Sequence, residues 1–166
     1  MSSSLDILGL PEAPDWQHPA FGNFPVHPLV YRDQRIEYAA EHLRGRLVYL
    51  ASPYTKVVQE NGVWSARRSA VAAGAAEFWA SRLAFHGVCA VSPIVQAHRM
   101  VMVDIGEVLD PLDTDFWTGW CAPILAAASA VVIPPIEGWK ESAGVWREAR
   151  MALGAVKPVW ILAGDD

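Results

Sequence analysis

Short apolar runs alternate with longer amphipathic stretches along this chain. The runs at 47–51, 88–92, 130–134 and 158–163 are rich in β-branched and other apolar residues, which predicts four buried strands. Residues 64–85, 116–128 and 143–153 have the composition and spacing of helices, and residues 32–44 predict a short helix before the first strand. Helices therefore separate the strands, and this order predicts a parallel sheet with right-handed crossovers.

The first 30 residues differ in composition from the rest of the chain. Five prolines lie among serine, glycine and aromatic residues, which is typical of an extended arm. Either this arm is a disordered leader, or Trp16, Phe21 and Phe24 pack it on its own domain or on a neighbouring subunit. We favour packing, because isolated aromatic residues are unusual in disordered segments.

These patterns predict an α/β protein. We expect a three-layer sandwich, flavodoxin- or Rossmann-like, with a mainly parallel sheet of four or five strands. A Pro-rich N-terminal arm with a short helix would occupy residues 1–44, and the α/β domain residues 45–166.

Polar residues at 52–56, 92–98 and 134–142 each follow a predicted strand. The carboxyl ends of parallel strands meet at one edge of a sheet, so these three loops should form a single site.

The predicted helix at 143–153 carries a carboxylate on its apolar face. Ser142 stands where an N-cap is expected, and its hydroxyl would satisfy a free backbone N–H group. Glu148 falls within a stripe of small apolar residues with helical spacing, namely Val145, Ala149 and Ala152. Burying a carboxylate in such a stripe costs free energy, unless the group is paired with a positive charge or has a function in the site.

The spacing of Glu148 also fits an ordinary surface role. The carboxylate can pair with Arg147, Arg150 or Lys140 at a solvated helix edge, and spacing alone favours this interpretation. The helical pattern directs Arg147 and Arg150 away from the apolar stripe.

Composition narrows the classes of protein. The chain has 166 residues, a formal charge of -5 and a pI near 5.5, and its thirteen Lys and Arg residues form no basic stripe. This argues against binding to a long nucleic acid but leaves a small anionic ligand open. Cys89 and Cys121 lack the spacing of a metal site or a disulfide framework, so we expect no metal and a cytoplasmic location. Prolines interrupt the longest apolar run, so we expect no membrane span.

Residues 138–148 resemble the active-site helix of the nucleoside 2-deoxyribosyltransferase superfamily, in which a Glu nucleophile follows a Ser or Asp by six residues. Ser142 and Glu148 have this spacing, and residues 47–54 are similar to the family's first strand and turn. Together with residues 92–94, His98 and the 138–139 dipeptide, the pattern resembles an uncharacterised bacterial and phage branch. The resemblance covers roughly residues 46–163.

The resemblance implies cleavage of the N-glycosidic bond of a nucleoside 5′-monophosphate, without a cofactor. Glu148 would attack the anomeric carbon, and Tyr49 would orient the carboxylate. Ser142 matches the Ser that contacts the 5′-phosphate in 2′-deoxynucleoside 5′-phosphate N-hydrolases, with Gly144 beside it at the helix start. Related proteins form dimers or larger assemblies, which implies a homodimer or homotetramer whose neighbouring subunits complete the pocket.

Other residues have both a functional and a structural interpretation. Ser52, Tyr54 and Thr55, with Lys56 next to them in the first loop, offer donors to ribose or phosphate, although turn residues are often polar for local reasons. His98 would reach the same pocket, or be an ordinary structural His. Trp139 would stack on the base, or simply anchor its loop to the sheet.

One position departs from the family pattern. An Asp that helps to handle the sugar or the departing base is usual on the helix before the third strand, and Cys121 stands there. A thiol is a weaker acceptor than a carboxylate, which puts sugar or base recognition in doubt. Asp115 would substitute if the helix register differs, or else cap the helix. The alternatives to hydrolysis are a nucleotide-binding module without turnover, a base-exchanging deoxyribosyltransferase and, more distantly, NAD cleavage.

Overall fold

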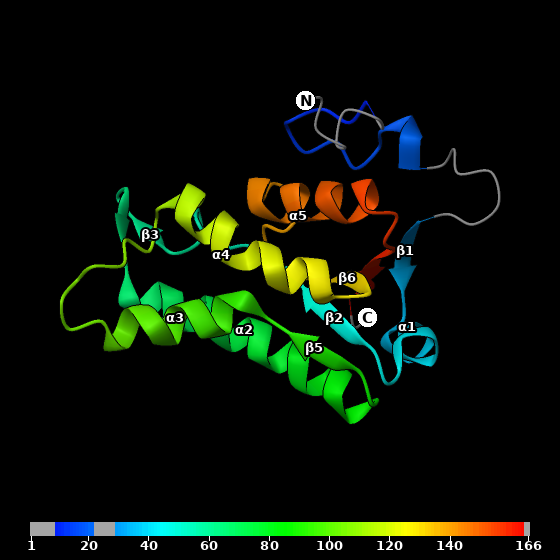
Figure 1. The fold of residues 1–166 in the computed structure, drawn as a ribbon, viewed down its shortest axis with the longest axis horizontal. Coiled ribbons are helices and arrows are strands. Elements are labelled where there is room, and N and C mark those ends of the chain that lie inside the picture. Colours follow the sequence, from blue (N-terminus) through cyan, green and yellow to red (C-terminus); the bar gives the residue numbers. More distant parts are fainter. Residues whose placement is uncertain (1–8, 22–28, 165–166) are drawn as a thin grey trace.

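The computed structural model describes residues 9–21 and 29–164, and its centre is a five-stranded sheet with the order β1-β7-β6-β2-β5 (Figure 1). All pairings in this sheet are parallel. The α/β fold with a mainly parallel sheet is therefore confirmed. The strands are β1 (Val30–Gln34), β2 (Leu47–Leu50), β5 (Cys89–Val91), β6 (Ala130–Ile133) and β7 (Val159–Leu162).

Helices cover both faces of the sheet and give the three layers. In Figure 1, α4 (Thr114–Ala127) and α5 (Ala143–Gly154) lie above the strands, and α1 (Ile36–Leu43) and α2 (Ala66–Phe85) lie below them. A hydrophobic core lies on each face of the sheet. Successive side chains of a strand point to opposite faces, so alternate residues of each central strand contribute to the two cores. In β2, Tyr49 joins the core under α5, whereas Val48 and Leu50 join the core over α1 and α2.

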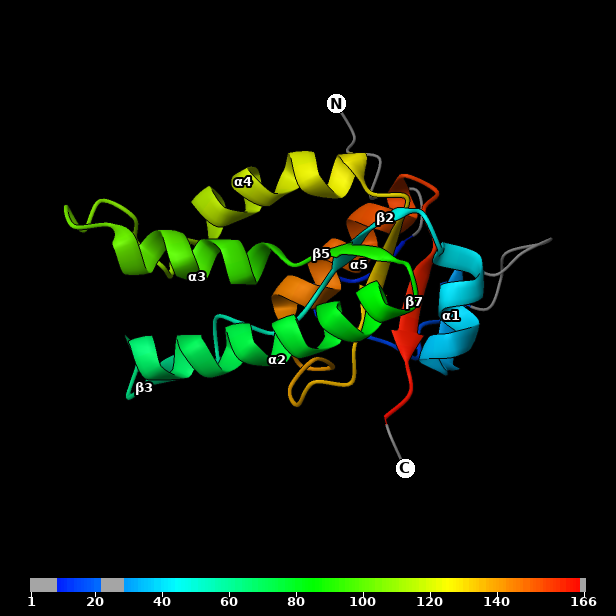
Figure 2. The same cartoon turned by 90° about the horizontal axis from the view of Figure 1, so that it is seen from below.

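The strand order reverses direction at β2, which creates a topological switch point. From β2 the chain crosses to β5 on one side of this strand, and later to β6 on the other side. The carboxyl ends of β2 and β6 therefore face a crevice in which ligands of open α/β sheets bind. The ends of α2 and α3 (Pro93–Val103) project past the sheet at this edge and run side by side (Figure 2).

Three elements differ from the sequence prediction. Residues 30–34 form the edge strand β1, so the helix predicted at 32–44 begins only at Ile36. Residues 93–103 form α3, although the prediction treated 92–98 as a loop. A hairpin of β3 (Gln59–Glu60) and β4 (Val63–Trp64) replaces part of the predicted loop before α2.

Each of these differences has a physical cause. β1 is a half-exposed edge strand that contains Arg32, Asp33 and Gln34, so it lacks the apolar signal of a central strand. Pro93 occupies the start of α3, where its missing N–H group costs nothing, and it is therefore a helix start signal. Asn61 and Gly62 both have positive φ in the hairpin turn, which is the standard use of this dipeptide.

The described part of the N-terminal arm packs on its own domain. Trp16 makes edge contacts with Trp146 and Trp139, at ring-centroid distances of 4.9 and 5.0 Å, and Phe21 meets Trp146 at 5.5 Å. The Trp146 indole donates a hydrogen bond of 2.9 Å to the Pro11 carbonyl. These contacts bury the outer face of α5. The third aromatic residue of the prediction, Phe24, lies outside the described residues. Within the ranges described, no helix has the length and apolar character needed to cross a membrane.

Candidate active site

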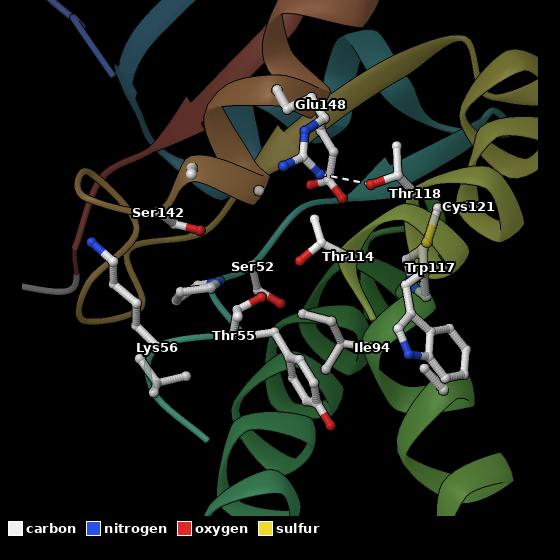
Figure 3. Close-up of a pocket in the computed structure, with 18 of the residues that line it drawn as sticks. Ser52, Thr55, Lys56, Ile94, Thr114, Trp117, Thr118, Cys121, Ser142 and Glu148 are labelled. Carbon is white, nitrogen blue, oxygen red and sulfur yellow. Dashed lines mark hydrogen bonds between the residues drawn. The ribbon is translucent and has the colours of Figure 1, made fainter. Parts of the chain in front are cut away.

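A cavity of about 310 Å³ lies at the switch point of the sheet. It is enclosed by the end of β2 and the loop after it, by the first turns of α3, and by α4 and α5 (Figure 3). The three segments predicted to meet at one edge therefore do so, although the second of them is the start of α3 and not a loop. The helix that follows the third segment, α5, forms a wall of the cavity. The polar and titratable lining residues include Tyr49, Ser52, Tyr54, Thr55, Lys56, Thr114, Thr118, Cys121, Glu141, Ser142, Arg147 and Glu148.

Glu148 and Tyr49 form the centre of this cavity. The Tyr49 hydroxyl donates a hydrogen bond of 2.5 Å to Glu148 Oε1, joining β2 to α5 across 99 residues of sequence. Tyr49 points to the α5 side of the sheet because of the alternation along β2, and Glu148 lies on the inner face of α5. The carboxylate is partly buried and borders the cavity rather than bulk solvent.

The surroundings of Glu148 raise its pKa to about 7. Burial has the largest effect, because it disfavours the charged form. The Tyr49 hydrogen bond and the charge of Arg147 oppose burial and lower the pKa, but only in part. A carboxyl group with a pKa near neutrality changes its charge in the range in which cells operate, which is common at catalytic sites.

Glu148 is not part of a surface ion pair. Within residues 9–21 and 29–164, the salt bridges are those of Arg35 with Glu37 and of Arg67 and Arg68 with Glu60. The alternative in which Glu148 pairs with a neighbouring Lys or Arg therefore finds no support in the structure.

Cys121 lies next to the central pair. Its thiol neighbours the Tyr49 hydroxyl, and burial raises the pKa of Cys121 to about 11, so the group is neutral at pH 7. Burial, together with the negative charge of Glu148, raises the pKa of Tyr49 above its ordinary value. The residue suggested as a substitute, Asp115, is exposed and does not line the cavity, while Asp113 caps α4 through the Phe116 amide.

The first turn of α5 forms an anion-friendly end of the cavity. Ser142 is the N-cap, and its hydroxyl accepts a hydrogen bond of 3.3 Å from the Val145 amide. Gly144 in the same turn also lines the cavity, and Figure 3 shows Lys56 on the same side as Ser142. Backbone N–H groups at a helix start and a nearby ammonium group both favour a phosphate.

Ser52 and Thr55 contribute hydroxyl groups from the loop after β2. The Ser52 side chain is more than nine-tenths buried, and its hydroxyl has no hydrogen-bond partner among the described residues. A buried hydroxyl without a partner costs about 1–3 kcal/mol. Ser52 is therefore suited to bind a polar group of a ligand.

His98 and Tyr54 belong to a hydrogen-bonded chain behind the cavity wall. The Trp64 indole donates to the Tyr54 hydroxyl at 3.1 Å, that hydroxyl contacts Ser69 Oγ at 2.8 Å, and Ser69 Oγ contacts His98 Nδ1 at 2.9 Å. Tyr54 lines the cavity, whereas His98 is buried outside the lining. His98 thus supports Tyr54 from behind and does not reach the pocket.

Trp139 also lies outside the cavity lining. Its ring packs against Trp16 of the arm, and the Trp16 indole donates a hydrogen bond of 2.9 Å to the Lys140 carbonyl. The alternative interpretation, in which Trp139 anchors its loop, agrees with this geometry, because the ring contacts Trp16 of the arm and packs against the core on the α5 face of the sheet.

Sequence reasoning missed several lining residues. Arg147 was expected to point away from the inner stripe of α5, which is wrong: it lines the cavity and its Nη1 donates a hydrogen bond of 2.7 Å to Thr118 Oγ1. A helical wheel locates only Cα positions, and a long side chain can reach around the helix. On α4, Thr114, Trp117 and Thr118 face the cavity with Cys121, at helical spacing that was readable from the sequence.

The fold and the cavity define an α/β protein with a candidate ligand site at the switch point of a parallel sheet. The chain belongs to the family described as a domain of unknown function (DUF1937), whose model matches residues 46–164. That match carries no link to nucleoside 2-deoxyribosyltransferases. No curated protein matches the chain, and no solved structure matches it. Among the residues with described positions, no three His, Cys, Asp or Glu side chains are grouped so as to hold a metal ion.

Proposed function

We propose that this protein cleaves the N-glycosidic bond of a nucleoside 5′-monophosphate or a related nucleotide, with Glu148 as the nucleophile. The observation that carries this proposal is the Glu148–Tyr49 pair, which borders a cavity next to the first turn of α5. One end of the cavity is suited to a phosphate, and its centre offers a carboxylate. The resemblance of residues 138–148 to the deoxyribosyltransferase helix agrees with this arrangement.

The chemistry requires a carboxylate that can face a positive centre. Breaking an N-glycosidic bond gives an oxocarbenium-like transition state, which Glu148 stabilises by its charge before forming a glycosyl ester. Tyr49 donates to Oε1 and leaves Oε2 to attack the anomeric carbon. Water then hydrolyses the ester. No cofactor or metal takes part in these steps.

The dimensions of α5 fit a nucleoside monophosphate. Glu148 lies six positions after Ser142, which corresponds to about 9 Å along a helix. A phosphate bound at the helix start therefore leaves room for one sugar ring before the carboxylate.

Base release from purified protein tests the proposal. Incubation with ribo- and deoxynucleoside 5′-monophosphates should release free base, and Glu148→Gln should reduce the rate at least 1000-fold. Glu77→Gln, a change at an exposed residue of α2 outside the cavity, is the matched control and should leave the rate unchanged. Nucleotide binding without base release by the unaltered protein would show a binding module instead. Transfer of the sugar to an added base would indicate the deoxyribosyltransferase reaction.

We propose that the protein acts in the cytoplasm. Cys89 and Cys121 are both free thiols, which suits a reducing compartment. Nucleoside monophosphates are also cytoplasmic metabolites. Fractionation of cells that express a tagged protein tests this location.

A further inference from the structure

The cavity holds a guanidinium group close to the proposed nucleophile. Arg147 lines the cavity and is held to α4 by its hydrogen bond to Thr118, three residues before Cys121. Figure 3 shows Glu148 between Ser142 on one side and Thr118 with Cys121 on the other. If phosphate binds at the start of α5, the guanidinium therefore lies toward the opposite end, where the base would be.

Groups that could protonate a departing base are scarce at this end. Cys121 and Tyr49 both hold their protons tightly, because burial raises their pKa values. Among the described lining residues, the carboxylate other than that of Glu148 belongs to Glu141, which is exposed directly before the α5 N-cap. A base that leaves without a proton carries away the electron pair of the broken bond as negative charge.

We propose that Arg147 binds the departing base and stabilises this negative charge, and that the site accepts pyrimidine nucleotides whose base has a carbonyl oxygen next to the glycosidic nitrogen. This inference rests on the proposed function. Glu148 forms a bond to C1′ while the C1′–N1 bond breaks, and the electron pair spreads from N1 onto the carbonyl oxygen O2. The base later takes a proton from water, and a second water hydrolyses the ester.

The geometry of Arg147 suits this role. A guanidinium carries five N–H donors in a rigid plane, and the bond to Thr118 uses one of them. That bond also fixes the plane, so little side-chain entropy is lost when a ligand binds. A fixed positive group at the place where negative charge develops is a strong source of transition-state stabilisation.

Leaving-group dependence tests the inference. The substrates are 2′-deoxyuridine 5′-monophosphate and its 5-fluoro analogue, whose base is the better leaving group. At pH 7 both substrates keep most of their N3 protons, and the ionised fraction of Glu148 is the same for both substrates on any one protein, so it cancels in the comparison. Arg147→Gln should lower kcat/KM about 100-fold for the uracil nucleotide and about 10-fold or less for the fluorinated one, and Arg147→Lys should restore part of the loss. Arg99→Gln, an exposed change outside the cavity with the same loss of charge, should change neither rate. Equal losses for both substrates would overturn the inference.

A binding measurement separates this inference from the proposed function. Uracil should bind to the Glu148→Gln protein in calorimetry, and adding Arg147→Gln should weaken that binding at least tenfold. If the unaltered protein releases no base but the Arg147-dependent binding is seen, the proposed function fails and the base contact stands. If uracil does not bind, or binds equally without Arg147, the inference fails whatever the protein cleaves.

Discussion

At the scale of single residues, Glu148 is governed by opposing effects. Burial raises its pKa, and the Tyr49 hydroxyl and the charge of Arg147 lower it, with a net value of about 7. Burial wins because it removes water that would otherwise stabilise the carboxylate. At neutral pH about half of the molecules therefore carry an ionised nucleophile, and the two partners of Glu148 control that fraction.

Tyr49→Phe should shift the pH dependence of base release. It removes a hydrogen bond that favours the ionised carboxylate, so the pKa of Glu148 should rise by about one unit and the acidic limb should move to higher pH. At pH 7 the rate should fall about fivefold, and at pH 9 by less. The measurement is a pH–rate profile, with Tyr31→Phe, at a residue stacked on Trp160 away from the cavity, as control. An unchanged profile would show that Tyr49 does not tune the carboxylate.

Glu148→Gln should stabilise the fold above neutral pH. The pKa of Glu148 is about 7 in the folded protein and 4.5 in the absence of burial, so the folded state loses stability as pH rises from about 4.5 to 7. The variant removes this penalty, which corresponds to about 1–3 kcal/mol. Urea unfolding at pH 8.5 and pH 4 measures it. The gain should appear at pH 8.5 and vanish at pH 4, and a gain of equal size at both values would contradict the assignment.

At the scale of elements, α5 combines three tasks. Its first turn forms the anion-friendly end of the cavity, its inner face carries Glu148, and its outer face buries Trp146 under the arm. The positions of Glu148 and Trp146 depend on helical spacing, whereas the anion-friendly end depends on the N-cap, Ser142. Because one rigid helix carries both the phosphate end and the carboxylate, the distance between them is fixed.

Ser142→Ala should separate the role of Ser142 in capping α5 from its role in binding the nucleotide. Loss of the capping hydroxyl should reduce the free energy of unfolding by about 1 kcal/mol and should also weaken nucleotide binding. Ser65→Ala is the matched control, because Ser65 caps α2 through the Arg68 amide and does not line the cavity. It should cost similar stability and leave binding unchanged. Thermal denaturation and calorimetry measure the two effects, and equal binding by both variants would limit Ser142 to capping.

At the scale of the whole molecule, the arm is a structural part of the domain. Trp16 stacks on Phe21, touches Trp139 and Trp146, and donates a hydrogen bond to the Lys140 carbonyl, two residues before the α5 cap. Trp16→Ala should therefore lower the free energy of unfolding by about 2–3 kcal/mol and raise the KM for the nucleotide. Ile105→Ala, at a residue that is 99% exposed and outside the cavity lining, should do neither. Denaturant unfolding that matches the unaltered protein would count against this role of the arm.

We also propose a homodimer or homotetramer. Val71, Phe78 and Phe85 form an exposed apolar stripe at every seventh residue of α2, and a second copy of the chain would bury it. Light scattering at micromolar concentration should give a multiple of 18.2 kDa, and Phe78→Glu should reduce the mass. A monomeric mass for the unaltered protein would refute the assembly.

Local pattern accounts for most of the fold. The apolar runs that became β2, β6 and β7 and the capped segment that became α5 were all evident in the sequence, because central strands and capped helices carry strong local signals. The edge strand β1 was missed, since its pairing with β7 depends on neighbours and not on its own residues.

The sequence by itself determined the alternation of β2, β5, β6 and β7 with helices and the meeting of the segments after β2, β5 and β6 at one edge, and it singled out Glu148, Tyr49 and Ser142. Only the tertiary structure decided which other side chains reach the cavity. It buries His98 behind Tyr54 and brings Arg147 in from the side of α5. The physical reason is that periodicity fixes the direction of a Cα–Cβ bond, whereas the reach of a long side chain and the desolvation of a carboxylate depend on several elements packed together.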